Sequence, residues 1–304
     1  MQGSGQGLSL DAAVALAPRE AFPLRKADVA LKLPDGSSLD GRLDWATQAR
    51  SVDAAPSVPE VTVIQAPAVL PRHTLDQVVG SLSIRRLDPA WLAGSGLPDA
   101  LLSVSADFSA TLHDQTELQD ARIRLDVGNG SRWNGQPLAA DIDFAVKAVS
   151  PAVPQDPGYR VDDLRLDVRL GENRLSGEGR LGWENTQLQL LLKAVRLADF
   201  WPGVDGAAEL DARLQGAMAS HNLELQARYD MGPAGGDVLG DAPVVLRTRL
   251  EGGYSAPTDA APNAAWTGRI ARLEASHAQV SLNAEQPVPL LLHPEPLPPI
   301  MCCR

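Results

Sequence analysis

The sequence predicts an all-β protein, in which repeated strand units form an elongated, curled antiparallel sheet with a groove along it. The first observation is alternation: from Leu164 to Leu170, aliphatic residues alternate with Arg and Asp, as in a strand with one apolar face. The second is that such segments recur along most of the chain. The third is that turn residues separate them, whereas helical periodicity is almost absent.

The alternation predicts about fifteen strands. The clearest of them cover residues 29–33, 61–64, 81–84, 101–112, 121–127, 141–149, 164–170, 188–192, 208–214, 222–229, 244–250 and 279–283. Turns rich in Gly, Pro, Asn or Asp are expected at 34–38, 128–130, 171–173, 231–237 and 254–265. Short helices are expected only at Leu10–Leu16 and around Trp91 and Phe200.

One side of these strands is aliphatic, and its residues are the candidate lining of the groove. Because side chains alternate along a strand, every second residue belongs to this side, while polar residues occupy the other. The candidate lining residues are Leu102, Val104, Phe108, Ile123, Leu125, Val127, Ile142, Phe144, Val146, Leu164, Leu166, Val168, Leu170, Leu188, Leu190, Leu210, Leu214, Leu223, Leu225 and Leu246. Such a face must meet another sheet, a membrane, a partner or an apolar ligand.

The chain divides into three regions. Residues 1–24 form a poorly defined N-terminal segment, residues 25–292 the repeated β-groove region, and residues 293–304 a disordered tail. Within the middle region, residues 31–45 resemble residues 168–183, and both stretches contain a turn-strand unit that ends on a Trp. Repeated units that do not bury their own apolar face favour an elongated stack over two unrelated domains.

The composition argues against several kinds of partner. The net charge is -11 and the sequence pI is about 4.9, so neither nucleic acid nor an anionic membrane surface is expected to bind, since both need clustered Lys and Arg. No segment approaches the roughly 20 apolar residues of a membrane helix. The two cysteines, Cys302 and Cys303, are adjacent and lack neighbours with zinc-ligand spacing.

No catalytic, cofactor-binding or metal-binding constellation is evident, so we expect the chain not to be an enzyme. All five histidines are expected to be solvated, because none has metal-ligand spacing or a neighbouring nucleophile; they are His73, His113, His221, His277 and His293. Asp141 and Asp143 are close, but they belong to the expected polar face, where no cleft is predicted. The six tryptophans mostly end strand units near Gly, which suits a structural anchor at least as well as a ligand platform.

An open aliphatic face of this length could carry lipid. Fifteen strands spaced ~4.8 Å apart make a sheet of roughly 70 Å, far beyond the ~30 Å hydrocarbon core of a bilayer. A sixteen-carbon chain in water is penalised by roughly 12 kcal/mol, at about 0.8 kcal/mol per CH₂. A continuous Leu, Val and Ala face could offset most of this penalty, and an aromatic content of only 4% leaves room in the groove.

The C-terminal third carries a more specific pattern. Residues 264–292 read AAWTGRIARLEASHAQVSLNAEQPVPLLL: a Trp-x-Gly-x-Ile-x-x-Leu strand, a polar turn, a second strand, and a Pro-flanked PVPLLL. This arrangement resembles the middle region of the TamB family of translocation and assembly module subunits, relatives of the AsmA-like proteins. LAADIDFAV (138–146), NRLSGEGRLGW (173–183) and GAAELDARLQGAM (206–218), which includes a D-x-R-L-x-G stretch, are similar to the family's repeated β units.

The resemblance, which covers most of residues 25–292, implies both a fold and a function. TamB-like proteins are long β-sheets curled into a hydrophobic groove, anchored in the inner membrane by an N-terminal helix and reaching across the periplasm of diderm bacteria. The resemblance therefore implies transport of phospholipid between the inner and outer membranes. It also implies support of outer-membrane protein and autotransporter assembly, together with an Omp85-type, TamA-like outer-membrane barrel subunit.

The sequence differs from the family pattern at both ends. It shows neither the N-terminal membrane helix nor the C-terminal module of the family, and an atypical tail follows Leu292. We therefore expect an internal fragment that is neither anchored nor docked on the barrel subunit by itself. We expect no cofactor and no metal, because the residues show no constellation that would bind either.

Two other interpretations remain open. A β-strand-pairing chaperone surface would bind substrate strands at exposed strand edges. An adhesin-like β-sandwich without lipid transport would close its apolar faces against each other, and its radius in solution would be that of a compact chain.

Overall fold

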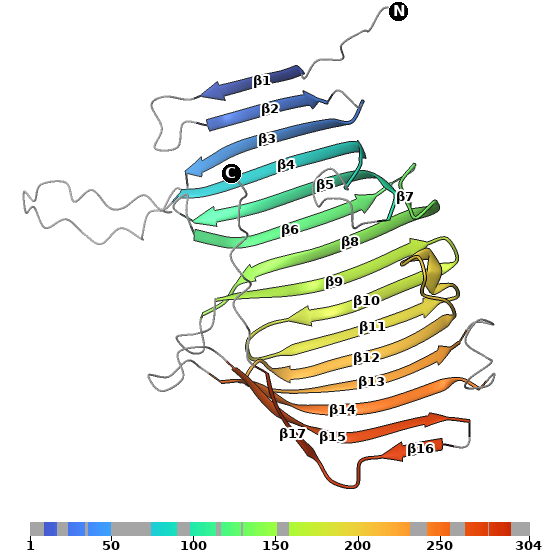
Figure 1. Cartoon of the computed structure of the whole chain (residues 1–304). Coiled ribbons are helices and arrows are strands. Elements are labelled where there is room, and N and C mark those ends of the chain that lie inside the picture. The colour runs from blue at the N-terminus through green and yellow to red at the C-terminus, as the bar shows by residue number, and fades with distance from the viewer. Residues whose placement is uncertain are drawn as a thin grey trace, which may run out of the picture.

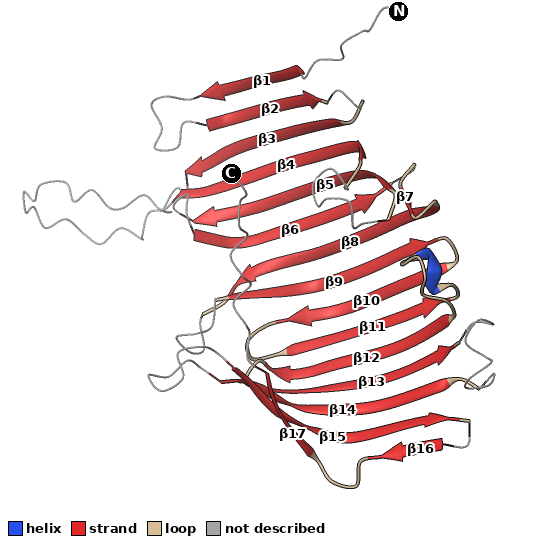
Figure 2. Cartoon of the chain, in the orientation of Figure 1, coloured by secondary structure: helices blue, strands red, loops and turns tan. Residues whose placement is uncertain are grey.

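Strands dominate the computed structural model, which describes residues 9–16, 24–33, 36–49, 74–89, 98–113, 117–128, 130–150, 158–231, 242–255, 265–278 and 280–292. The strands are β1 (Ser9–Leu16), β2 (Leu24–Lys32), β3 (Ser38–Ala49), β4 (Thr74–Leu87), β5 (Ala100–His113), β6 (Glu117–Val127), β7 (Arg132–Trp133), β8 (Gln136–Ala148), β9 (Tyr159–Leu170), β10 (Asn173–Leu181), β11 (Thr186–Ala194), β12 (Ala207–Ala217), β13 (Ser220–Asp230), β14 (Val244–Ser255), β15 (Ala265–His277), β16 (Val280–Asn283) and β17 (Val288–Leu292). In these residues the helical element is the 3-10 helix η1 (Leu197–Asp199). The predicted all-β class is confirmed (Figure 2).

The strands form one antiparallel sheet in which chain order is spatial order. From β1 to β6 each strand pairs with the next, β6 pairs with β8, and from β8 to β15 each strand again pairs with the next. The short β7 pairs with the starts of β5 and β8. β16 and β17 pair with opposite halves of β15 and share the last position. Figure 1 shows a broad, twisted sheet whose C-terminal end bends where β17 leaves the general strand direction.

The sheet is long and has a single layer in the described part of the chain. With fourteen strands side by side before the position shared by β16 and β17, a spacing of ~4.8 Å gives a length of roughly 70 Å. Extensive contacts between described elements join only strands that are hydrogen-bonded neighbours. The described strands therefore form one open sheet, not the two facing sheets of a sandwich.

The pairing register places aliphatic residues of successive strands opposite one another. Phe108 of β5 pairs with Gly80 of β4 and with Ile123 of β6, and Ile123 pairs with Phe144 of β8. Because residues two apart point to the same side of a strand, one side of the sheet is predominantly aliphatic from β1 to β17, and it also holds Thr248 of β14 and the buried Asp76 of β4. We call this side the apolar face and the opposite side the polar face.

β-Bulges keep the aliphatic residues on the apolar face where their spacing changes from two residues to three. In β9, Val161 and Leu164 are three residues apart, and the extra residue is accommodated at Asp163, whose φ is 54°. In β4, Arg86 with a φ of 59° lies at the corresponding irregularity. Without a bulge, a spacing of three residues would place the remaining aliphatic residues of the strand on the polar face.

The structure corrects one predicted helix and confirms another. Leu10–Leu16 is not helical but belongs to β1, because its larger apolar side chains recur every second residue, the period of a strand. The sheet thus begins before residue 25, within the segment expected to be poorly defined. The short helix expected around Phe200 is confirmed as η1. The predictions for residues 61–64, for the surroundings of Trp91 and for 293–304 lie outside the described residues.

The described residues form no helix with the length and apolar character that crossing a membrane requires.

Candidate functional site

The apolar face contains every residue that the sequence predicted as groove lining. Leu166 of β9 pairs with Ile142 of β8 and with Gly177 of β10, and Gly177 pairs in turn with Leu190 of β11. The same register continues through β12, β13 and β14. All twenty predicted residues therefore lie on one face, although what they bind is a separate question.

Several strands that extend the same face show weaker alternation in the sequence. β3 and β10 carry glycine at some of the positions where other strands carry an aliphatic residue, such as Gly41 and Gly177. Glycine interrupts the alternating pattern without breaking the strand, so these segments are predicted only as parts of the two turn-strand units that end on Trp45 and Trp183. Leu175 and Leu181 of β10 nevertheless share the face of Leu164 and Leu166.

The apolar face is incompletely covered. Of the twenty predicted lining residues, nineteen are half-buried and only Leu170 is buried. Among the described residues, the buried hydrophobic side chains are Val78, Ala121, Leu170, Ala194, Ala212 and Trp266. Neighbouring strands flank each aliphatic side chain, but for most of the face no described element lies above it. This face can therefore receive an apolar partner along its length.

At one edge of the sheet, η1 covers the strand ends. Asn173, only 1% exposed, donates from Nδ2 to Asp199 Oδ2 at 3.0 Å and accepts at Oδ1 from the Arg196 backbone N–H at 2.9 Å. Trp133 Nε1 donates to the Phe200 carbonyl at 2.9 Å. Leu170 is correspondingly 2% exposed. In Figure 2, η1 lies beside the ends of β9 to β11 and limits the apolar face on that side.

The polar face carries ion pairs both along single strands and between neighbouring strands. Arg124 on β6 reaches Asp141 on β8 at 3.0 Å, and Arg122 reaches Asp143 at 2.7 Å. This arrangement confirms that Asp141 and Asp143 lie on the polar face. Because each carboxylate is paired with an arginine of the neighbouring strand, both belong to the ion pairs of the polar face.

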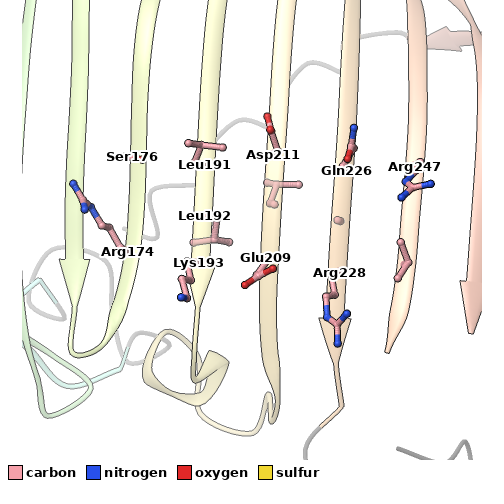
Figure 3. A pocket seen from close by; sticks show the side chains of 13 residues that line it. Arg174, Ser176, Leu191, Leu192, Lys193, Glu209, Asp211, Gln226, Arg228 and Arg247 are labelled. Atoms are coloured by element: carbon pink, nitrogen blue, oxygen red, sulfur yellow. The ribbon is translucent and has the colours of Figure 1, made fainter. Parts of the chain in front are cut away.

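One hollow of the polar face is mixed in charge. A hollow of about 530 Å³ lies over β10 to β14. Figure 3 shows Arg174, Lys193, Glu209 and Arg228 along it, each on a different strand. Since acidic and basic side chains are interspersed, the hollow has no field of one sign that would select an ion.

Several carboxylates of this face are held ionised by arginine. Hydrogen bonds from Arg160 to Asp162, at 2.8 and 2.9 Å, lower the pKa of that carboxyl, and Lys147 at 3.6 Å acts in the same direction. Hydrogen bonds from Arg269 likewise lower the pKa of Glu251. In each of these ion pairs, both the carboxylate and its basic partner are therefore charged near neutral pH.

At the edge opposite η1, the apolar face deepens into a hollow that we call the aromatic cavity. Its volume is about 580 Å³, and its lining comes from β9 to β15 and from β17. The aromatic side chains in the lining are Tyr159, Trp183, Tyr254 and Trp266, with aliphatic residues such as Leu223 and Leu290 between them. No Asp, Glu, Lys or Arg is among the described residues that line it.

Trp266 is the most buried ring of the aromatic cavity, with 8% exposure. It lies over two paired glycines, because a Cβ at Gly252 or at Gly268 would come within 2.5 Å of its ring atoms. Glycines at these positions thus make room for a large ring on the sheet surface. The two glycines therefore anchor this ring on the sheet, and the ring also lines the aromatic cavity.

The expectation that all histidines are solvated is wrong for His221. Its ring lies in the aromatic cavity, where Trp266 Nε1 donates to His221 Nε2 at 2.8 Å. Nε2 is therefore an acceptor, and the proton is on Nδ1, which faces the carbonyls of Ala217 and Met218 at 3.3 and 3.2 Å. The signal in the sequence was its position two residues before Leu223, in the apolar register of β13. His73 and His293 lie outside the described residues.

Comparisons with family models, curated proteins and solved structures found no match to this chain. The likeness to TamB proteins therefore remains a resemblance in the residues quoted above, and the site must be interpreted from its own chemistry. The site is the apolar face, which is aliphatic over most of its length and has the aromatic cavity at one edge. In the described residues no cluster of His, Cys, Asp and Glu could hold a metal ion.

Proposed function

We propose that the chain is a segment of a periplasm-spanning, TamB-like protein whose apolar face carries phospholipid acyl chains between the inner and outer membranes. The observation that carries the proposal is the largely aliphatic face of an open sheet, which continues from strand to strand, while the ion pairs between strands lie on the opposite face. A role beside an Omp85-type barrel subunit in outer-membrane protein assembly is proposed on the sequence resemblance alone.

The energetics favour an acyl chain as the occupant. Each CH₂ group removed from water is stabilised by about 0.8 kcal/mol, and the described sheet offers a continuous surface of roughly 70 Å by the usual strand spacing. A phospholipid headgroup would remain in water beside the strand ends. Transport of this kind needs no reacting group, so we propose that the segment is not an enzyme.

A matched pair of substitutions on β9 tests the proposal. Leu166 lies on the apolar face and Arg165, its neighbour, on the polar face. After incubation with phosphatidylethanolamine vesicles and gel filtration, bound phospholipid is counted by native mass spectrometry. Leu166→Glu should lower the bound lipid several-fold because it places a charge against the acyl chain, while Arg165→Glu should leave it unchanged. Equal loss in both variants, with circular dichroism unchanged, would contradict the proposal.

A second candidate function, pairing with substrate β-strands, is favoured by β1. This strand pairs with β2 on one side only among the described strands, and every one of its side chains is exposed. An exposed edge strand with a single charged residue, Asp11, is a template for another strand. A crosslinker placed at Val14 should then capture unfolded outer-membrane protein, and capture of phospholipid alone would contradict this role.

A further inference from the structure

The aromatic cavity differs in chemistry from the remainder of the apolar face. Between β5 and β8 that face is built from aliphatic residues with Phe108 and Phe144 as its aromatic side chains. The aromatic cavity instead gathers two of the three tyrosines and two of the six tryptophans in the chain. Aromatic rings are scarce in this protein, so their concentration at one end of the sheet indicates a ligand different from a simple acyl chain.

Three polar side chains in the lining of the aromatic cavity already have partners within the protein. The indole N–H of Trp266 is used by His221, and the Nδ1 side of His221 faces two backbone carbonyls. The Thr186 hydroxyl donates to the Gly182 carbonyl at 2.9 Å and accepts from the Gly182 N–H at 3.2 Å. A charged or strongly polar ligand group would therefore lose its hydration here without gaining a partner.

Two tyrosine hydroxyls are available at the rim of the aromatic cavity. Tyr159 and Tyr254 are 43% and 44% exposed, so each presents a ring to the aromatic cavity and can keep its hydroxyl in water. Flat rings pack well against aromatic side chains in offset or edge-to-face arrangements. A volume of about 580 Å³ lies within the range of small-molecule sites, roughly 300 to 1,000 Å³.

We propose that the aromatic cavity binds a neutral, flat, fused-ring lipid of the sterol-like class, with its ring system against Trp183 and Trp266 and its single polar end between the tyrosines of the rim. This inference rests on the proposed function, because it assigns a ligand class to one part of the same apolar face. The aliphatic part of the apolar face would hold acyl chains, and the aromatic cavity would hold ring lipids.

Binding of dehydroergosterol, a fluorescent sterol, to the purified full chain tests this assignment through the anisotropy of the sterol's own emission. The double variant Trp183→Leu with Tyr254→Leu keeps the aromatic cavity apolar but removes two ring surfaces. It should bind the sterol at least about tenfold more weakly, since each ring contact contributes beyond its area. Phe108→Leu, which removes a ring outside the aromatic cavity, should leave sterol binding unchanged.

A parallel titration with cis-parinaric acid, an acyl-chain probe, separates this inference from the proposed function. If parinaric acid binds, and Leu125→Glu weakens it while Arg124→Glu does not, the proposed function stands. In that case, absent sterol binding, or sterol binding that is equal in wild type and the double variant, overturns the inference alone. If the sterol binds at the aromatic cavity and parinaric acid does not bind, the inference holds and the acyl-chain function fails.

Discussion

Asp167 illustrates how single residues stabilise the polar face. Its carboxylate accepts hydrogen bonds from Arg174 Nε at 2.9 Å and Arg174 Nη2 at 3.2 Å, and from Arg169 Nη2 at 3.0 Å. The hydrogen bond from Arg174 is the largest cause that lowers the pKa of Asp167, and the bond and charge of Arg169 act in the same direction. Arg174 is on β10, so this contact joins two strands across the polar face.

Acid should therefore weaken the sheet through this carboxylate. A group whose folded-state pKa is lowered stabilises the fold above its unfolded pKa, here about 3.9, and loses that contribution as the pH falls through the folded value. The urea midpoint, measured in mild detergent, should fall between about pH 4 and pH 2, and Asp167→Asn should reduce this dependence. Glu184→Gln, in an exposed turn, is the control; an identical pH dependence in Asp167→Asn and wild type would contradict the account.

At the scale of elements, alternation predicted strands better than it predicted their ends and irregularities. β5, β6 and β9 are found where every second residue is aliphatic. The bulge at Asp163 could not be recognised from alternation alone, because a spacing of three residues also occurs in helices and turns. β10 was obscured by Gly177 and Gly179, which occupy apolar-face positions without an aliphatic side chain.

The bulge at Asp163 gives a prediction for a single element. Its φ of 54° lies in the left-handed region, which Asp tolerates, Gly favours and β-branched residues disfavour by roughly 1–2 kcal/mol. Asp163→Val should therefore destabilise the chain by about that amount, and Asp163→Gly should be neutral or slightly stabilising. Urea unfolding in mild detergent measures both.

Arg165→Val, two residues away in extended conformation, is the control for the bulge prediction and should have a much smaller effect. A loss of stability that is as large for Asp163→Gly as for Asp163→Val would show that the left-handed backbone is not the cause.

At the scale of the whole molecule, an open sheet has a different shape and solubility from a compact domain. A compact chain of 304 residues has a radius of gyration of about 19 Å. The described sheet alone extends roughly 70 Å along its long axis, so its radius of gyration exceeds that of a compact chain. The aliphatic character of the apolar face was predictable because it follows from local alternation repeated along the chain. The aromatic cavity was not, since His221 and Trp266 are 45 residues apart and meet only through the register of β13, β14 and β15.

The exposed apolar face and open strand edges predict association of the isolated chain in water. Small-angle scattering in mild detergent, with the detergent contrast-matched, should give a radius of gyration well above the roughly 19 Å of a compact chain. Removal of the detergent should cause aggregation. A monodisperse, two-state monomer of compact radius, without lipid or detergent, would contradict the open sheet.

Photocrosslinking with matched positions on the two faces tests the central claim most directly. A photoreactive residue placed at Leu166 or Leu125 lies on the apolar face, while one at Arg165 or Arg124 lies on the polar face of the same strands. With radiolabelled phospholipid vesicles, the account predicts lipid adducts at the two leucine positions and none at the two arginine positions. Equal labelling of both faces would contradict the claim that the apolar face carries lipid.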